Sequence, residues 1–202
     1  VYQNVNTSEL LYGRSYKLID TTRLGQVTLH AEEATSQAFY FAFGSMQMLR
    51  LGYPDWSIGL VWTVSVIAEI IVLWFAPTML LRLGPYRLLL IAGATTFVRW
   101  LGMAVDPPLW GAIVLQTLHA GTLSCTLLGL MAFMERLVKD EESARAQSLY
   151  VTITGLMNAG MFMLNGPLYQ AYGGASYLLG AVLAALALVI LIAFRKRLER
   201  PV

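Results

Sequence analysis

Three side chains that can carry charge or exchange a proton interrupt long apolar stretches of this sequence: Glu69, Arg99 and His119. A charge at the centre of a bilayer costs about 2.5–3.5 kcal/mol or more, so such residues are usually paired or face water. Because carboxyl and imidazole groups change charge with their surroundings, Glu69 and His119 are candidates to carry a proton. Arg99 is a candidate to meet a solute; the alternative is that Arg99 and Glu69 neutralise each other as a structural ion pair.

Helical spacing adds uncharged polar residues to these three. Gln116 and His119 are three residues apart and share a helix face with Thr122 and Thr126. Several such stripes, turned inward, would enclose a polar cavity at the midplane, where secondary transporters bind substrate. The candidate solute-binding residues are Gln37, Tyr40, Arg99, Gln116, His119 and Asn158, and the candidate proton-coupling residues are Glu69 and His119. The alternative is that His119 is a hydrogen-bonded core residue and that Asn158 joins neighbouring helices.

The composition indicates which medium surrounds these residues. Hydrophobic residues make up 57% of the chain and charged residues 13%, and the mean hydropathy is +0.60. Soluble domains average roughly 45–50% apolar and about 25% charged residues, and so short a chain cannot hide this much apolar surface in one core. Lipid is therefore the expected solvent. The net charge of +2 is too small to indicate nucleic-acid binding.

Six apolar segments each approach the ~20 residues with which a helix spans a bilayer. They cover residues 32–51, 57–81, 86–105, 109–134, 146–169 and 175–194. Only helices satisfy their own backbone there, so the expected fold is an all-α membrane protein, a six-transmembrane-helix bundle at 32–194. Short links rich in Gly and Pro make sequential helices antiparallel neighbours. Residues 1–31 are predicted to be a polar N-terminal loop or tail, and residues 195–202 a basic cytoplasmic tail.

The distribution of Lys and Arg predicts the orientation in the membrane. The links after the second and fourth segments and the C-terminal tail carry most of the basic residues, whereas the opposite side has only Arg50. Basic loops face the cytoplasm. We therefore expect a multi-pass protein of the cell inner membrane with both termini cytoplasmic.

The sequence shows no motif for catalysis or for a cofactor. It has no Gly-rich phosphate loop, metal-ligand cluster or nucleophile elbow, so we expect no catalytic residues, no metal and no cofactor. Cys125 is the only cysteine and lies within an apolar segment, which indicates a buried small residue. A membrane-embedded enzyme that uses Glu69 and His119 as acid and base is the weaker alternative, because no nucleophile accompanies them.

A set of short motifs is typical of a known family. They lie at residues 59–62, 66–70, 98–101, 146–150 and 168–174, and the most specific is Gln-Thr-Leu-His-Ala-Gly-Thr at 116–122. Over residues 36–180 the chain resembles the C-terminal six-helix half of major facilitator superfamily transporters, in particular the 3-phenylpropionic acid transporter branch, which is related to nucleoside:proton symporters. The turn 82–87 resembles the cytoplasmic motif between the second and third helices of each half. Position 37 departs from the family, which often has His where this chain has Gln37.

The resemblance implies a twelve-helix whole with 3+3 inverted repeats, of which these would be helices seven to twelve. It implies alternating access and proton-coupled symport of a small organic solute such as an aromatic carboxylate. It also places the fourth segment beside the central cavity, which favours Gln116 and His119 for the solute and gives Arg99 a supporting role. The implied partners are the lipid bilayer, the solute, protons, and an N-terminal six-helix half or a second copy. The remaining alternative is a truncated half that does not function without a partner half.

The orientation can be tested by labelling cysteines placed at positions 106 and 141. Because the basic loops are expected inside, a cysteine at 106 should react with a membrane-impermeant maleimide added to intact cells. A cysteine at 141 should react only after the membrane is permeabilised. Labelling at 141 but not at 106 in intact cells would invert the predicted topology.

Overall fold

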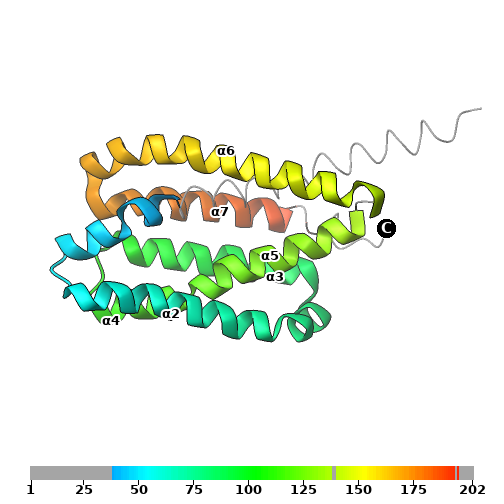
Figure 1. Ribbon diagram of the computed structural model, residues 1–202, viewed down its shortest axis with the longest axis horizontal. Coiled ribbons are helices and arrows are strands. Elements are labelled where there is room, and N and C mark those ends of the chain that lie inside the picture. Colours follow the sequence, from blue (N-terminus) through cyan, green and yellow to red (C-terminus); the bar gives the residue numbers. More distant parts are fainter. Residues whose placement is uncertain (1–37, 138–139, 194, 196–202) are drawn as a thin grey trace, which may run out of the picture.

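The computed structural model describes residues 38–137, 140–193 and 195, and its regular elements within these residues are all helical (Figure 1). A helical segment at 38–50 precedes α2 (Asp55–Trp74), α3 (Ala76–Ala104), α4 (Leu109–Thr117), α5 (His119–Leu137), α6 (Asp140–Tyr172), the 3-10 helix η1 (Gly173–Tyr177) and α7 (Leu178–Ala193). The expected all-α class is thus confirmed for this part of the chain. The predicted tail at 1–31, the start of the first span at 32–37 and the tail residues 196–202 lie outside the described residues.

The helices lie side by side along the long axis of the bundle (Figure 1). The central helix is α3, which packs against α5 on one side and α7 on another, while α2 packs against α4 and α5. The long helix α6 contacts η1, which follows it directly, and α5, and its Tyr169 stacks on Phe43 of the segment 38–50. Figure 1 shows α6 along one edge of the bundle, antiparallel to α7.

Four helical stretches among the described residues are long and apolar enough to cross a membrane: 55–74, 76–104, 109–133 and 147–193. The last stretch contains α6, η1 and α7, so the chain reverses direction within it. The predicted first span, 32–51, is described only from residue 38. The six-helix count is therefore not confirmed, although a multi-span helical bundle is.

The turns follow from local backbone chemistry at a few positions. Positive φ angles occur at Gly52, Gly84, Gly173 and Asp106, and each lies in a link that the Gly and Pro pattern predicts. Gly84 (φ 71°, ψ 167°) interrupts the helical conformation within α3 just before Pro85. Only Gly adopts this conformation at little cost, and Pro85 cannot donate the next helical hydrogen bond.

One predicted helix is divided differently from the expectation. The segment 57–81 was expected to be continuous, but α2 ends at Trp74 and α3 begins at Ala76. The reason is Pro77, which has no N–H for the Leu73 carbonyl and restricts the residue before it. The regular helix is therefore interrupted at Phe75, whose N–H donates to the Val72 carbonyl at 3.1 Å.

Polar and apolar side chains are arranged oppositely to those of a soluble protein. Large apolar side chains face outward, among them Ile70 (57% exposed) and Trp74 (80%). Polar groups are buried, among them Thr96, Arg99 and Gln116. Lipid solvates the exposed apolar atoms, so only the bundle interior can supply hydrogen-bond partners. Cys125 is buried and free, as its apolar setting predicts.

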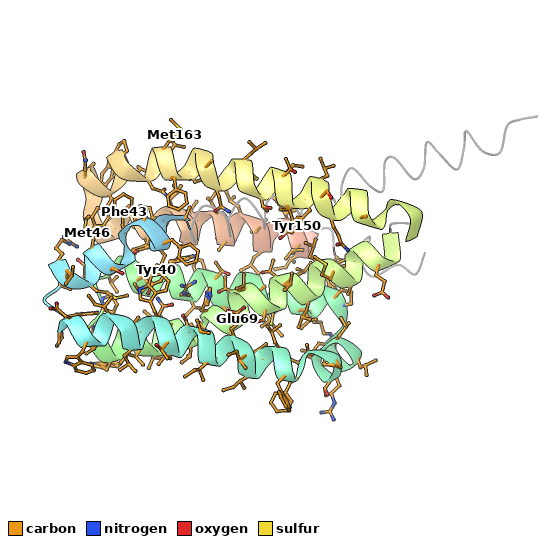
Figure 2. All side chains as sticks on the ribbon, in the orientation of Figure 1. Tyr40, Phe43, Met46, Glu69, Tyr150 and Met163 are labelled. Carbon is orange, nitrogen blue, oxygen red and sulfur yellow. The ribbon has the colours of Figure 1, made fainter. Side chains whose placement is uncertain are left out.

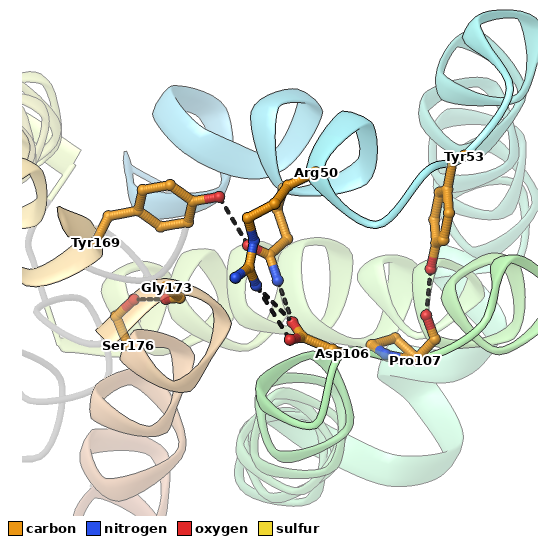
Figure 3. A network of polar contacts seen from close by, with 8 residues as sticks. Arg50, Tyr53, Asp106, Pro107, Tyr169, Gly173 and Ser176 are labelled. Atoms are coloured by element: carbon orange, nitrogen blue, oxygen red, sulfur yellow. Dashed lines mark hydrogen bonds and ion pairs between the residues drawn. The ribbon is translucent and has the colours of Figure 1, made fainter. Parts of the chain in front are cut away.

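A polar network ties three segments together at one end of the bundle (Figure 3). Its members are Gln47, Arg50, Asp106 and Tyr169, which we call the Asp106 network. Asp106 accepts a hydrogen bond from Gln47 Nε2 and pairs with Arg50 at 3.1 Å. Tyr169 Oη donates to Gln47 Oε1 at 2.7 Å. The network thereby joins the segment 38–50 to the ends of α3 and α6.

A second hydrogen bond between links lies beside the Asp106 network. The buried Tyr53 hydroxyl donates to the carbonyl of Pro107, which connects the link before α2 to the link before α4 (Figure 3). Burial, and to a smaller extent the Asp106 carboxylate, raises the pKa of Tyr53. The hydroxyl therefore stays protonated, and remains a donor, at neutral pH.

The Asp106 network leaves no room for a side chain at Gly174. A Cβ there would overlap Asp106 Oδ1 and Gln47 Nε2, which are joined by a hydrogen bond. We expect Gly174→Ala to lower the free energy of unfolding by about 1–3 kcal/mol, because the overlap breaks this bond. Thermal unfolding of the purified protein in detergent measures the effect. Gly59→Ala is the control, since no atom lies within 4 Å of a Cβ there; equal losses at both positions would contradict the close contact.

Candidate functional site

A buried arginine surrounded by aromatic rings lies near the same end of the bundle. Arg99 is 1% exposed. Its guanidinium carbon lies 4.3 Å from the centre of the Trp100 ring and 5.2 Å from the centre of the Tyr40 ring. Its Nη2 donates to Oε1 of Gln116 at 3.0 Å. Three elements meet here, because Tyr40 lies on the segment 38–50, Arg99 on α3 and Gln116 on α4.

Further aromatic rings enclose this group. Trp100 stacks on Tyr177 of η1 with ring centres 5.4 Å apart and planes 5° apart. Tyr40 contacts Trp62 of α2 at 4.6 Å and Trp100 at 6.1 Å. We call Tyr40, Arg99, Trp100, Gln116 and Tyr177 the Arg99 cluster; each is at most 2% exposed. Such ring faces attract a guanidinium by about 0.5–2 kcal/mol each, which offsets part of the cost of burying its charge.

The backbone is irregular between Gln116 and His119. The sequence predicts one helix over 109–134, but α4 ends at Thr117 and α5 begins at His119. The Thr117 hydroxyl donates to the Val114 carbonyl at 2.7 Å, which is the acceptor that a regular helix would offer to the Leu118 N–H. Leu118 bonds instead to the Leu115 carbonyl at 3.2 Å. At this point the regular ladder is interrupted, since the Val114 carbonyl bonds to the Thr117 hydroxyl and the Leu118 N–H bonds to Leu115.

The remaining predicted site residues lie at different distances from the Arg99 cluster. His119 is 8% exposed at the start of α5, within electrostatic range of Arg99. Glu69 is half-buried on α2, nearer the middle of the bundle than Tyr40 (Figure 2). Asn158 is half-buried on α6. Gln37 lies outside the described residues.

The structural ion pair between Glu69 and Arg99 is not formed. Arg99 donates to Gln116 and stacks on two rings, and no ion pair joins its guanidinium to Glu69. The expected pair was based on two opposite charges within apolar segments. Helix rotation decides which side chains meet at a given depth, and it directs Arg99 toward α4.

Sequence reasoning missed two residues of the Arg99 cluster, Trp100 and Tyr177. Trp100 follows Arg99 directly, so it does not share a helical stripe with it, and Tyr177 lies in a 3-10 turn outside every predicted stripe. The only available signal was their aromatic type close to an intramembrane arginine. Within the described part of the chain, no group of three or more His, Cys, Asp or Glu side chains could hold a metal ion.

The chain is similar in sequence to a known family and to two curated proteins. Residues 33–179 match the MFS_1 like family. The chain is 28% identical over 156 residues to the Probable 3-phenylpropionic acid transporter of Escherichia coli (strain K12). The aligned region covers 77% of this chain and 41% of that protein. It is also 26% identical over 150 residues to the Maltose permease of Geobacillus stearothermophilus. This aligned region covers 73% of this chain and 38% of the permease.

These relatives are longer than the chain. The chain spans about two fifths of the length of the two curated relatives, 41% of one and 38% of the other. No solved structure matches it.

The stacked setting of Arg99 can be tested with Arg99→Lys. Lysine keeps the charge but cannot stack a planar group on Trp100 and Tyr40 while it bonds to Gln116. We expect the free energy of unfolding to fall by about 1–3 kcal/mol, measured by thermal unfolding in detergent. Arg87→Lys, at an exposed position of α3, should change it by less than about 0.5 kcal/mol. If both variants unfold at the wild-type temperature, the aromatic setting does not stabilise the fold.

Proposed function

We propose that this chain, which belongs to the MFS_1 like family, forms one half of a membrane protein that acts as a secondary transporter for a small organic solute. The supporting observation is the Arg99 cluster, a buried polar group inside an otherwise apolar bundle. Polar groups at membrane depth are costly, and in membrane proteins they mark pathways for solutes and ions. The proposed location is the cell inner membrane with both termini cytoplasmic.

The proposed solute is an aromatic carboxylate. The Arg99 cluster offers a positive charge, hydrogen-bond donors and flat aromatic faces, and no carboxylate is among its members. That chemistry complements an anionic head and a planar apolar body. The relative named a Probable 3-phenylpropionic acid transporter supports this class of solute. Because the other relative is named a Maltose permease, a sugar is the second solute to be tested. Tyr40, Gln116 and His119 remain the proposed contacts, with Gln37 and Asn158 as further candidates.

Proton coupling is proposed to depend on Glu69 and His119. Glu69 is a carboxyl group on a membrane-length helix, and Arg99 is bonded to Gln116 rather than to it. His119 lies close to the Arg99 cluster, where a change in its charge would act on a bound anion. These two groups would thus link the protonation state to the solute.

The proposed partner is an N-terminal six-helix half or a second copy of this chain. The helix α6 exposes Leu156 (69%) and Met163 (82%), and no atom lies within 4 Å of a Cβ at Gly155 or Gly160. Small residues let a second helix approach closely in a membrane. A face of this kind supports helix-to-helix packing with the partner half.

The function is tested by uptake into liposomes that contain the chain together with its N-terminal half. We expect 3-phenylpropionate to accumulate when an inward proton gradient is imposed, and less accumulation without the gradient. Maltose is the comparison solute. Accumulation of neither solute would contradict the proposed function, whereas accumulation by the chain alone would favour a second copy as the partner.

Glu69→Gln is expected to abolish accumulation against a concentration gradient while downhill exchange of the solute continues. The amide keeps the shape of the carboxyl group but cannot exchange a proton. The measurement is proton-driven uptake compared with counterflow of labelled 3-phenylpropionate. Glu135→Gln, at an exposed position of α5, is the control and should leave both unchanged. Unchanged uphill uptake in Glu69→Gln would show that another group couples the proton.

A further inference from the structure

We propose that Arg99 acts on the solute through Gln116, by fixing its amide so that Gln116 Nε2 and Tyr40 Oη together form a donor pair for one carboxylate oxygen. This inference rests on the proposed function and assigns the contacts within the same site. Gln116 and Tyr40 would be the direct contacts, and Arg99 would be a positioning residue.

The first step is the orientation of the Gln116 amide. A guanidinium has only N–H donors, so the group that faces it must be an acceptor. Arg99 Nη2 bonds to Gln116 Oε1 at 3.0 Å, and Gln116 is 0% exposed. The amide therefore cannot flip without placing its N–H groups against the N–H groups of Arg99. The consequence is that Gln116 Nε2 points away from Arg99 as a donor.

The second step is that this donor lacks an acceptor. Gln116 Nε2 has no hydrogen-bond partner among the described residues, and neither has Tyr40 Oη. The Tyr40 hydroxyl lies beside the Gln116 amide without forming a hydrogen bond of normal geometry to it. Buried polar groups are nearly always paired, and each exception needs a structural or functional reason. Two adjacent buried donors can both be satisfied by one acceptor between them.

The third step is the chemical class of that acceptor. Gln116 Oε1 accepts from Arg99, and the amide atom left without a partner is the donor Nε2. The indole Nε1 of Trp100 and the hydroxyl of Tyr177 are also buried without hydrogen-bond partners, which adds two donors to the same cluster. A carboxylate oxygen accepts two or more hydrogen bonds and donates none. The buried positive charge of Arg99 attracts an anion more than a neutral solute, so this cluster favours a carboxylate over a sugar.

The fourth step separates Arg99 from direct contact. Its guanidinium is stacked on the Trp100 ring, lies over the Tyr40 ring and donates from Nη2 to Gln116, so protein groups already contact both its plane and its edge. The charge acts through space in a medium of low dielectric, where it favours an anion held by its neighbours. Positioning by Arg99 thus supplies both the amide orientation and the positive potential.

The decisive variant is Gln116→Glu. The new carboxylate keeps a partner for Arg99, so the fold is retained, but it replaces the donor beside Tyr40 by an acceptor with negative charge. We expect the affinity for 3-phenylpropionate to fall on the order of a hundredfold or more, because like charges in an interface repel strongly. The affinity for 3-phenylpropanamide, whose N–H groups can donate to the new carboxylate, should fall much less. Equilibrium binding to the reconstituted protein, containing the chain and its N-terminal half, measures both.

Tyr40→Phe tests the second donor with little change of shape. We expect binding of 3-phenylpropionate to weaken roughly tenfold, about the loss of one hydrogen bond to a charged group. Gln170→Glu and Tyr172→Phe are matched controls at exposed positions near the end of α6, and both should bind like the wild type. Thermal unfolding of every variant separates loss of binding from loss of folding.

The outcomes distinguish this inference from the proposed function. Reversed preference between 3-phenylpropionate and its amide in Gln116→Glu supports the donor pair, even if the wild type binds the solute but does not transport it. Unchanged affinity and preference in Gln116→Glu would show that the residue only holds Arg99, and would overturn the inference. Failure of the folded wild type to bind 3-phenylpropionate would overturn it as well. Absence of uptake despite binding would contradict only the proposed function.

Discussion

The guanidinium of Arg99, held between the faces of Trp100 and Tyr40 and bonded to Gln116, imposes a constraint that organises this end of the bundle. A buried charge in a bilayer has no water to solvate it, so protein groups must replace the hydration shell. No single helix can do this, and the rings and the amide come from the segment 38–50, α3 and α4. Burial of one charge therefore fixes the relative rotation of these elements.

The two ends of the bundle are held by different forces. The Asp106 network and the Arg99 cluster lie toward one end, where directional hydrogen bonds and stacked rings set the geometry. A separate core cluster contains Tyr86, Phe133 and Leu191, packed by apolar contact. Apolar packing depends on matching shapes, whereas hydrogen bonds also fix the direction from which two groups approach. The Asp106 end is thus the part of the structure specified by directional contacts.

The sequence predicted what is local and missed what depends on helix rotation. Gly84 with Pro85 and the positive-φ Asp106 end helices by their own backbone chemistry, so those turns could be foreseen. The candidates Tyr40, Arg99 and Gln116 do come together, because polar residues in apolar helices must seek each other. The pairing of Glu69 with Arg99 was not realised, and Trp100 was missed, since depth along a helix leaves its rotation undetermined. The break at Leu118 was also hidden, because it results from one hydroxyl competing for one carbonyl.

The break at Leu118 gives the two neighbouring polar residues separate supports. Gln116 ends α4 and is bonded to Arg99, whereas His119 begins α5, which packs along α2 and α3. In a continuous helix the two side chains would move as one body. Here the regular backbone bond from Leu118 to Val114 is replaced by the Thr117 hydroxyl, so the ladder resists bending least at this point. Gln116 and His119 therefore lie on separate helices with separate contacts, as the separate roles proposed for them require.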